Sequence, residues 1–206
     1  MIARAGETNV AGAILAGGSA RRLGGLAKGL ELVGGMRMVD HVAAALAPLT
    51  AEIVLVGAPS AVAGKLPALR AVADEFPGAG PLGGIISALR ATGRDTLVVA
   101  WDMPFVAAPV LAALLEAPRD SDASVPCSSN QLEPLCALYR ASALEPLARV
   151  FDNGERSAVA ALRALRLHCV MRESADVSPF ESVNTPEQLA AARSGTRTLT
   201  FPTGPS

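Results

Sequence analysis

The sequence Val10-Ala11-Gly12-Ala13-Ile14-Leu15-Ala16-Gly17-Gly18 places a pair of glycines just after a short apolar run. The run from Val10 to Leu15 contains only small or apolar residues, some of them β-branched, which predicts a buried strand. The glycine pair lets backbone amides approach a ligand closely, because glycine has no side chain. The segment therefore predicts a first strand with a ligand-binding loop at its carboxyl end.

Short apolar runs continue to alternate with longer alanine- and leucine-rich segments along the chain. This alternation predicts an α/β fold with three layers, α/β/α, around a mostly parallel, doubly wound sheet. The further predicted strands are Glu52–Val56, Leu69–Ala73, Thr96–Ala100, Ser124–Cys127, Leu135–Tyr139 and His168–Met171. The predicted helices are Met38–Leu49, Pro81–Ala91, Ala107–Ala117, Ala141–Val150, Ser157–Leu165 and a last helix that begins at Thr185-Pro186.

Length and composition favour one domain. A chain of 206 residues with 50% apolar composition is long enough to bury a core, so residues 1–193 are predicted to form a single domain. Residues 194–206 are polar and rich in Gly and Pro, which predicts a disordered tail. The 18 basic and 19 acidic residues nearly cancel, so no strong field attracts nucleic acid or an anionic membrane. An aromatic content of 3% also disfavours a stacking platform for single-stranded nucleic acid.

The sequence favours a cytoplasmic protein. No apolar run reaches the roughly 20 residues that span a bilayer, and the N-terminus lacks the basic-then-apolar pattern of an export signal. Cys127, Cys136 and Cys169 are an odd number without close pairing, so neither a disulfide framework nor a Cys-x-x-Cys metal site is indicated. We expect all three to be core thiols in a reducing compartment.

The loop after the first strand carries the charges that a phosphate site requires. Arg21 and Arg22 can bind phosphate oxygens in a fork, and Lys28 adds a compact positive charge. With Gly17 and Gly18 they predict a nucleotide cradle, against the alternative of a flexible loop with solvated charges. The spacing does not fit a P-loop, because the lysine has no glycine before it.

A second glycine-rich segment gives a weaker signal. Gly78, Gly80 and Gly83 have the Gly-x-Gly-x-x-Gly spacing of dinucleotide sites, but Pro81 stands inside the motif. The residues of 74–77 also separate the motif from the preceding strand. We therefore favour a loop that closes onto a helix, whose N-terminus can still attract an anion.

Asp102 follows the buried run Val98-Val99-Ala100 after a single tryptophan. A carboxylate at the carboxyl end of a central strand is placed to bind Mg²⁺, which offsets the charge of a triphosphate. The competing role is a cap for the helix that follows. We expect an exposed side chain whose removal leaves the core intact. The two histidines, His41 and His168, are expected to be structural or surface residues rather than catalysts.

Four segments of the sequence, taken as a set, carry a resemblance to a known family. They are the loop from Leu15 with Arg22, Gly24, Gly25 and Lys28, the segment Asp74–Gly84, the tetrad Asp102-Met103-Pro104-Phe105, and Val183-Asn184-Thr185-Pro186-Glu187. This set, spread over almost the whole predicted domain, resembles the molybdenum cofactor guanylyltransferases. The resemblance implies a Rossmann-like fold of the nucleotide-diphospho-sugar transferase type. It also implies transfer of GMP from Mg-GTP to the phosphate of molybdenum-bound molybdopterin, with release of pyrophosphate.

The resemblance further implies roles for individual residues. Nucleotide binding is expected from Leu15, Ala16, Gly17, Gly18, Lys28, Asp74 and Asp102. Acceptor binding is expected from Arg22, Gly25 and Asn184. Arg22, Lys28 and Asp102 would serve catalysis, with Asp102 as the ligand of Mg²⁺, the implied cofactor. The implied partners are GTP, molybdenum-molybdopterin, and molybdenum insertion proteins or molybdoenzyme chaperones that receive the product.

Two positions depart from the family pattern. Gly57 stands where the family usually has an asparagine that contacts the nucleotide, and Trp101 replaces a small residue, often cysteine. The bulk of Trp101 either narrows the pocket or packs beneath it. The Leu-Ala-Gly-Gly form of the loop favours GTP over CTP. Cytidylyl transfer to molybdopterin, nucleotidyl transfer to a phosphosugar, and non-catalytic nucleotide binding remain as alternatives.

Overall fold

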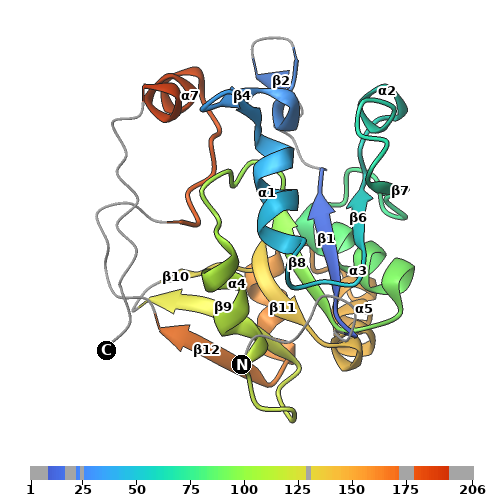
Figure 1. Ribbon diagram of the computed structural model, residues 1–206. Coiled ribbons are helices and arrows are strands. Elements are labelled where there is room, and N and C mark those ends of the chain that lie inside the picture. The colour runs from blue at the N-terminus through green and yellow to red at the C-terminus, as the bar shows by residue number, and fades with distance from the viewer. Residues whose placement is uncertain (1–8, 17–21, 24–25, 129–130, 172–178, 195–206) are drawn as a thin grey trace, which may run out of the picture.

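The computed structural model describes residues 9–16, 22–23, 26–128, 131–171 and 179–194, and its centre is an eight-stranded sheet (Figure 1). The strand order is β10-β9-β11-β8-β1-β6-β7, and β12 pairs with β9. The strands are β1 (Ala11–Leu15), β6 (Ile53–Val56), β7 (Arg70–Val72), β8 (Thr96–Ala100), β9 (Ala123–Ser128), β10 (Gln131–Leu132), β11 (Cys136–Tyr139) and β12 (Leu167–Met171). All seven strands predicted from the sequence are present.

The helices complete a three-layer α/β/α arrangement. They are α1 (Met38–Leu46), α2 (Ser60–Ala63), α3 (Pro81–Thr92), α4 (Ala108–Leu115), α5 (Leu144–Asp152), α6 (Ala158–Ala161) and α7 (Pro186–Arg193), with 3₁₀ turns η1 (Lys28–Leu30), η2 (Ala141–Ala143) and η3 (Leu162–Ala164). Along β1, Ala13 and Leu15 face the core under α3, α5 and α6, whereas Ile14 faces the core under α1 and α4. The side chains of a strand alternate between faces, so both faces of the sheet are buried.

The sheet is parallel where the predicted site lies. β1 runs parallel to both β6 and β8, and Leu15 is paired with Val56 on one side and with Ala100 on the other. Because parallel strands end at the same edge, the loops after these strands meet there. Farther out the sheet is mixed, since β11 is antiparallel to β8 and to β9. This confirms a mostly parallel sheet.

Several small elements escaped the sequence prediction. Two hairpins, β2 (Arg22–Leu23) with β3 (Leu26–Ala27) and β4 (Leu32–Val33) with β5 (Met36–Arg37), flank η1; β10 also has two residues, and the helix α2 has four. Strands of two residues are too short to show an alternating pattern. The glycine motif forms a loop onto α3, as expected: Gly78 and Gly80 have φ values of 83° and 86°, and Gly80 is the residue before the helix.

The prediction for the cysteines is partly wrong. Cys136 is a buried core thiol whose pKa is raised by its burial. Cys127 and Cys169 instead form a disulfide, with their Cα atoms 5.7 Å apart. The two are separated by 42 positions, and only the pairing of β9 with β12 brings them together (Figure 1). Sequence spacing therefore gave no indication of the bond.

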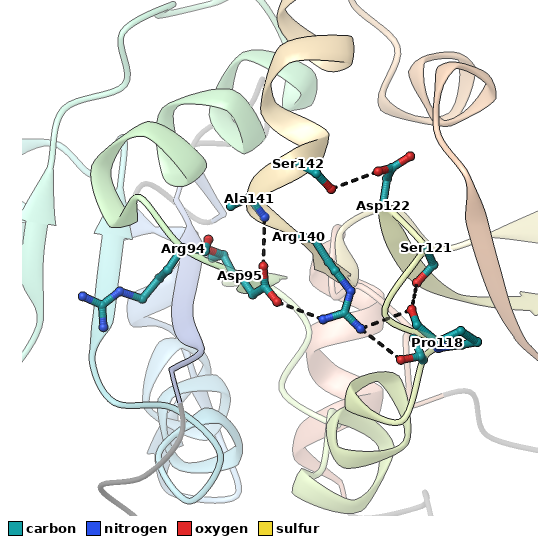
Figure 2. Close-up of polar contacts among 10 residues, drawn as sticks. Arg94, Asp95, Pro118, Ser121, Asp122, Arg140, Ala141 and Ser142 are labelled. Atoms are coloured by element: carbon teal, nitrogen blue, oxygen red, sulfur yellow. Dashed lines mark hydrogen bonds and ion pairs between the residues drawn. The ribbon is translucent and has the colours of Figure 1, made fainter.

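The amino end of the sheet is tied together by ion pairs rather than prepared for chemistry (Figure 2). Arg140 Nη1 donates to Asp95 Oδ2 at 2.8 Å and Arg140 Nη2 donates to the carbonyl of Ala117 at 2.9 Å. A surface cavity of about 510 Å³ lies at this end, lined in part by Asn9, Gly93 and Arg140. None of the predicted site residues lines it. None of the helices in the described part of the chain has the length and apolar character needed to cross a bilayer.

Asp122 joins three segments at the same end of the sheet. Its carboxylate accepts hydrogen bonds from Arg166 Nε and Nη2 at 2.9 and 2.8 Å, and from Ser142 Oγ at 2.9 Å. The hydrogen bonds from Arg166 are the main cause that holds the pKa of Asp122 far below its ordinary value. A depressed pKa in the folded state means that this stabilisation is complete above the unfolded pKa of about 3.9 and is lost as the pH falls below it.

Asp122→Asn is expected to lower the free energy of unfolding by about 1–2 kcal/mol at pH 7, because charge-assisted hydrogen bonds are lost and Arg166 is largely exposed. Urea unfolding of the wild type and the variant would measure this difference at pH 7 and at about pH 3, where it should be smaller. Asp120→Asn, a change at an exposed neighbour, is the control and should have little effect. A difference that does not depend on pH would contradict the assignment.

Candidate active site

The candidate site lies at the carboxyl ends of β1, β6 and β8. The backbone N–H of Ala16 donates to the carbonyl of Val56 at 2.9 Å, and that of Trp101 donates to the carbonyl of Leu15 at 3.1 Å. These bonds continue the sheet pairing one residue past each strand. Leu15 and Ala16 are therefore held between the loops after β6 and β8, where parallel α/β sheets bind ligands.

Lys28 is the centre of a buried polar cluster. Its side chain is 1% exposed, and Nζ donates to Asp102 Oδ2 at 2.5 Å and to Asn184 Oδ1. A buried ammonium is costly unless it is paired and hydrogen-bonded, and these two oxygens provide that pairing. The structure thus brings Lys28 together with Asp102, 74 positions farther along the chain, and with Asn184, 156 positions farther along.

The position of Asn184 follows from the start of α7. Thr185 and Gln188 form a capping box at the N-terminus of this helix, and Gln188 Oε1 also accepts from the backbone N–H of Asn184 at 2.6 Å. One residue earlier, the N–H of Val183 donates to the carbonyl of Asp102 at 2.9 Å. Asn184 is therefore fixed both to the helix cap and to the loop after β8. The Thr-x-x-Gln spacing is a signal from which the role of Gln188 could have been predicted.

Two further residues connect α7 to η1, and sequence reasoning missed both. Arg193 Nη2 donates to Glu31 Oε2 at 2.8 Å, and Arg193 Nε donates to the carbonyl of Leu32 at 3.0 Å. Figure 1 shows α7 beside the β4 hairpin. Glu31 is 162 positions from Arg193, so no local pattern indicates the pair. The pair holds α7, the helix that follows Asn184, against the end of the turn that carries Lys28.

Asp102 is less exposed than the sequence suggested. Its side chain is 15% exposed, so the expectation of an exposed strand-end carboxylate was wrong. The pairing with Lys28 explains the difference, because the ammonium replaces solvent around one oxygen. The other oxygen, Oδ1, accepts no hydrogen bond within the part of the chain that the structure describes.

These features fit a magnesium ion that is bound mainly by its substrate. Within the described ranges no three His, Cys, Asp or Glu side chains form a metal-binding group. Mg²⁺ commonly binds to one or two carboxylates and completes its shell with phosphate oxygens and water. Asp102 Oδ1 offers one such carboxylate oxygen.

Asp74 occupies a separate position. Its Oδ1 accepts from the backbone N–H of Phe76 at 3.0 Å and from Ser87 Oγ at 3.1 Å. No hydrogen bond or ion pair joins it to Lys28, Asp102 or Asn184. In the structure, Asp74 stabilises the loop that connects β7 to the N-terminus of α3.

Other predicted site residues are only partly described. Gly17, Gly18 and Gly25 lie outside the described residues. In the β2–β3 hairpin, the backbone of Arg22 pairs with that of Ala27, the residue before Lys28. The side chain of Arg22 lies outside the described parts of the chain. Of the histidines, His41 Nε2 lies 2.8 Å from the carbonyl oxygen of Val33, a contact that fits the structural role expected for it.

The two departures from the family pattern have clear structural outcomes. Gly57 has a φ of 74°, a left-handed conformation that glycine adopts freely and that asparagine tolerates better than most residues. Trp101 is 4% exposed and belongs to the core under α1 and α4. Of the two outcomes considered for its bulk, packing beneath the site is therefore the one observed.

Comparison with known proteins agrees with this geometry. Residues 12–185 match the model of the MobA-like NTP transferase domain family. A probable molybdenum cofactor guanylyltransferase from Chloroflexus aggregans is 45% identical over 162 residues, 76% of this chain and 77% of the relative. A molybdenum cofactor guanylyltransferase from Cereibacter sphaeroides is 36% identical over 190 residues, 89% and 95% of the two chains.

Solved structures show the same architecture. The crystal structure of molybdopterin-guanine dinucleotide biosynthesis protein A from Archaeoglobus fulgidus has a TM-score of 0.73 and 30% identity, over 89% of this chain and 97% of that one. 2-C-methyl-D-erythritol 4-phosphate cytidylyltransferase from Thermus thermophilus has a TM-score of 0.67 at 18% identity, over 88% and 96% of the chains, and shows the fold alone.

Together, the sheet, the strand-end cluster and these matches define an α/β nucleotidyltransferase of Rossmann-like type. Within that class, the chain belongs to the MobA-like NTP transferase domain family. The relatives described above, which are similar to it in sequence, are named as molybdenum cofactor guanylyltransferases.

Asp102→Ala is expected to lower the free energy of unfolding by about 3 kcal/mol, because the ammonium of Lys28 stays buried without its counter-charge. Adding Lys28→Met should recover part of this loss, since methionine carries no charge. Urea unfolding of the wild type, both single variants and the double variant would measure the coupling. Additive effects of the two substitutions would contradict a buried ion pair.

Proposed function

We propose that this protein transfers GMP from Mg-GTP to the phosphate of molybdenum-bound molybdopterin, giving the guanine dinucleotide cofactor and pyrophosphate. The observation that carries the proposal is the Lys28 ammonium, buried at the carboxyl ends of β1 and β8 between Asp102 and Asn184. A fixed cation beside a carboxylate whose second oxygen accepts no hydrogen bond among the described residues is suited to a magnesium-bound triphosphate. Membership of the family supports the same donor and acceptor.

The transfer requires no covalent intermediate on the protein. An oxygen of the acceptor phosphate attacks the α-phosphorus of GTP in line, and the bond from that phosphorus to the bridging oxygen breaks with its electron pair leaving on pyrophosphate. An ionised phosphate needs no general base. This fits a chain in which neither histidine is placed in the cluster around Lys28.

The charged residues neutralise and position the reactants. Lys28 and Arg22 stabilise the negative charge that moves toward pyrophosphate. Asp102 would hold Mg²⁺ through its free oxygen, and the ion, when bound, offsets the charge of the triphosphate. Asn184, which contacts Lys28, would orient the acceptor phosphate next to the donor.

The remaining assignments complete the substrate sites. The backbone of Leu15 and Ala16, with Gly17 and Gly18, would hold the guanine nucleotide, because amides after a buried strand can approach it closely. Asp74 would accept a hydrogen bond from base or ribose through the oxygen that its loop contacts leave free. Arg22 and Gly25 would contact the acceptor.

We place the reaction in the cytoplasm, where its nucleotide donor is available, and expect the product to pass to molybdenum insertion proteins or molybdoenzyme chaperones. Residues 1–193 would form the catalytic domain, which contains the 12–185 range that matches the family. The tail of residues 194–206, of which all but Ser194 lies outside the described residues, is assigned no part in catalysis.

Asp102→Asn is expected to reduce GTP-dependent transfer by at least about 10²-fold, since the amide keeps an acceptor for Lys28 but loses the charge that binds the metal. Mass spectrometry of the dinucleotide product, with Mg²⁺, GTP and molybdenum-molybdopterin supplied, would measure the rate. The matched control is Asp152→Asn, which changes an exposed carboxylate on α5 and should leave the rate unaltered. Normal turnover by Asp102→Asn would remove this residue from the metal site.

GTP is expected to bind at least about tenfold more tightly than CTP, ATP or UTP in the presence of Mg²⁺, because discrimination of this size needs only one or two base-specific hydrogen bonds. Equilibrium dialysis with the four nucleotides would measure the preference. Equal or tighter binding of CTP would contradict guanylyl transfer and would favour a cytidylyltransferase. Dialysis without Mg²⁺ controls for binding that does not involve the metal.

A further inference from the structure

Gly29 and Trp101 lie in closer contact than any larger residue at position 29 would allow. A Cβ atom built on Gly29 would lie 2.3 Å from Cε3, 2.7 Å from Cδ2 and 3.1 Å from Cζ3 of Trp101. All three are atoms of the six-membered ring of the indole. The backbone of Gly29 therefore rests directly against this ring, with no room for a methyl group.

Space rather than backbone conformation requires glycine here. Gly29 is not among the glycines with positive φ in the described chain, so alanine could adopt its backbone angles. The obstacle is the indole, and the indole has little freedom to move. The side chain of Trp101 is buried in the core under α1 and α4, and its backbone N–H donates to the carbonyl of Leu15. A close-packed ring of this kind resists displacement.

The contact sits beside the catalytic pair in both segments. Gly29 follows Lys28 in η1, and Trp101 precedes Asp102 at the end of β8. The two segments therefore make two neighbouring contacts. The backbone of Gly29 packs against the ring of Trp101, and the ammonium of Lys28 pairs with the carboxylate of Asp102. A change in the first separation is therefore expected to shift the backbone that carries Lys28 relative to the backbone that carries Asp102, because each pair of adjacent residues is only one peptide unit apart.

We propose that Trp101 is a positioning residue for Lys28: its ring supports Gly29 and so fixes how far η1 approaches the end of β8. The role is distinct from filling the core. A core residue contributes to stability wherever it lies, whereas this ring determines the distance between Lys28 and Asp102. This consequence for catalysis rests on the proposed function: in the transfer reaction, a displacement of the Lys28 ammonium by about 1 Å can lower the rate by roughly 10²-fold.

The test uses the reactivity of lysine in the ligand-free protein. The chain contains two lysines, Lys28, which is buried, and Lys65, which is exposed and serves as an internal reference. Acylation with N-hydroxysuccinimidyl acetate, followed by digestion and mass spectrometry, gives the ratio of labelling at the two positions. In the wild type, Lys28 should be labelled at least about tenfold more slowly than Lys65, because labelling requires local opening.

Gly29→Ala should raise the Lys28 to Lys65 ratio by about tenfold, since the added methyl group pushes η1 away from the ring. Trp101→Val should raise it as well, because the support is removed. The double variant Gly29→Ala/Trp101→Val should return toward the wild-type ratio, since valine ends before the three ring atoms and leaves room for the methyl group. Gly84→Ala is the control, because its Cβ would make only ordinary contacts, the nearest at 3.5 Å, and it is adjacent to neither lysine.

The double variant decides the outcome. A ratio below that of both single variants supports the positioning role, and a ratio at or above that of the two single variants overturns it. Gly29→Ala that leaves the ratio unchanged also overturns it. If Gly29→Ala fails to fold, recovery of folding in the double variant supports the proposal and failure of the double variant to fold overturns it.

Failure of this inference is distinguishable from failure of the proposed function, because the labelling needs no nucleotide. If the labelling pattern holds but the wild type transfers no GMP, the contact stands and the function is wrong. If the wild type transfers GMP but the labelling does not respond, the function stands and the positioning role is wrong. When both hold, kcat/KM for GTP should fall in each single variant and recover in the double variant.

Discussion

A buried positive charge is the constraint on which the site depends. Lys28 is 1% exposed, and an ammonium in such surroundings costs several kcal/mol unless it is paired. Its two partners come from the end of β8 and from the residue before the α7 cap. The native arrangement of the site therefore requires three distant segments to come together, and misplacement of any one of them leaves a buried polar group with one partner fewer.

The C-terminal helix belongs to this assembly. The backbone bond from Val183 to Asp102 and the ion pair from Arg193 to Glu31 anchor the two ends of the α7 segment. Val183 and Leu189 also pack with Val33 in a small separate core. Docking of α7 thus closes the site as well as covering apolar surface. The family match of residues 12–185 includes Asn184 and ends just before α7 begins.

The two ends of the sheet have different tasks. At the carboxyl end, Oδ1 of Asp102 accepts no hydrogen bond from the residues that the structure describes. At the amino end, both oxygens of Asp95 accept hydrogen bonds, from Arg140 and Ala141 (Figure 2). Both oxygens of Asp122 are likewise engaged, by Arg166 and Ser142. Groups with unused hydrogen-bonding capacity can bind a ligand, whereas saturated groups stabilise the fold.

The sequence by itself determined the α/β class and the seven predicted strands, and it indicated Lys28 and Asp102 as candidate residues, because strand pattern and local motifs are short-range properties. Asn184 was indicated only by the resemblance to the family. Only the tertiary structure decided that these three residues meet, that Arg193 reaches Glu31, and that Cys127 is bonded to Cys169. It likewise decided that Trp101 packs beneath the site. The physical reason is that such contacts depend on strand order and on which face of the sheet a helix covers, and neither is encoded in the spacing of residues along the chain.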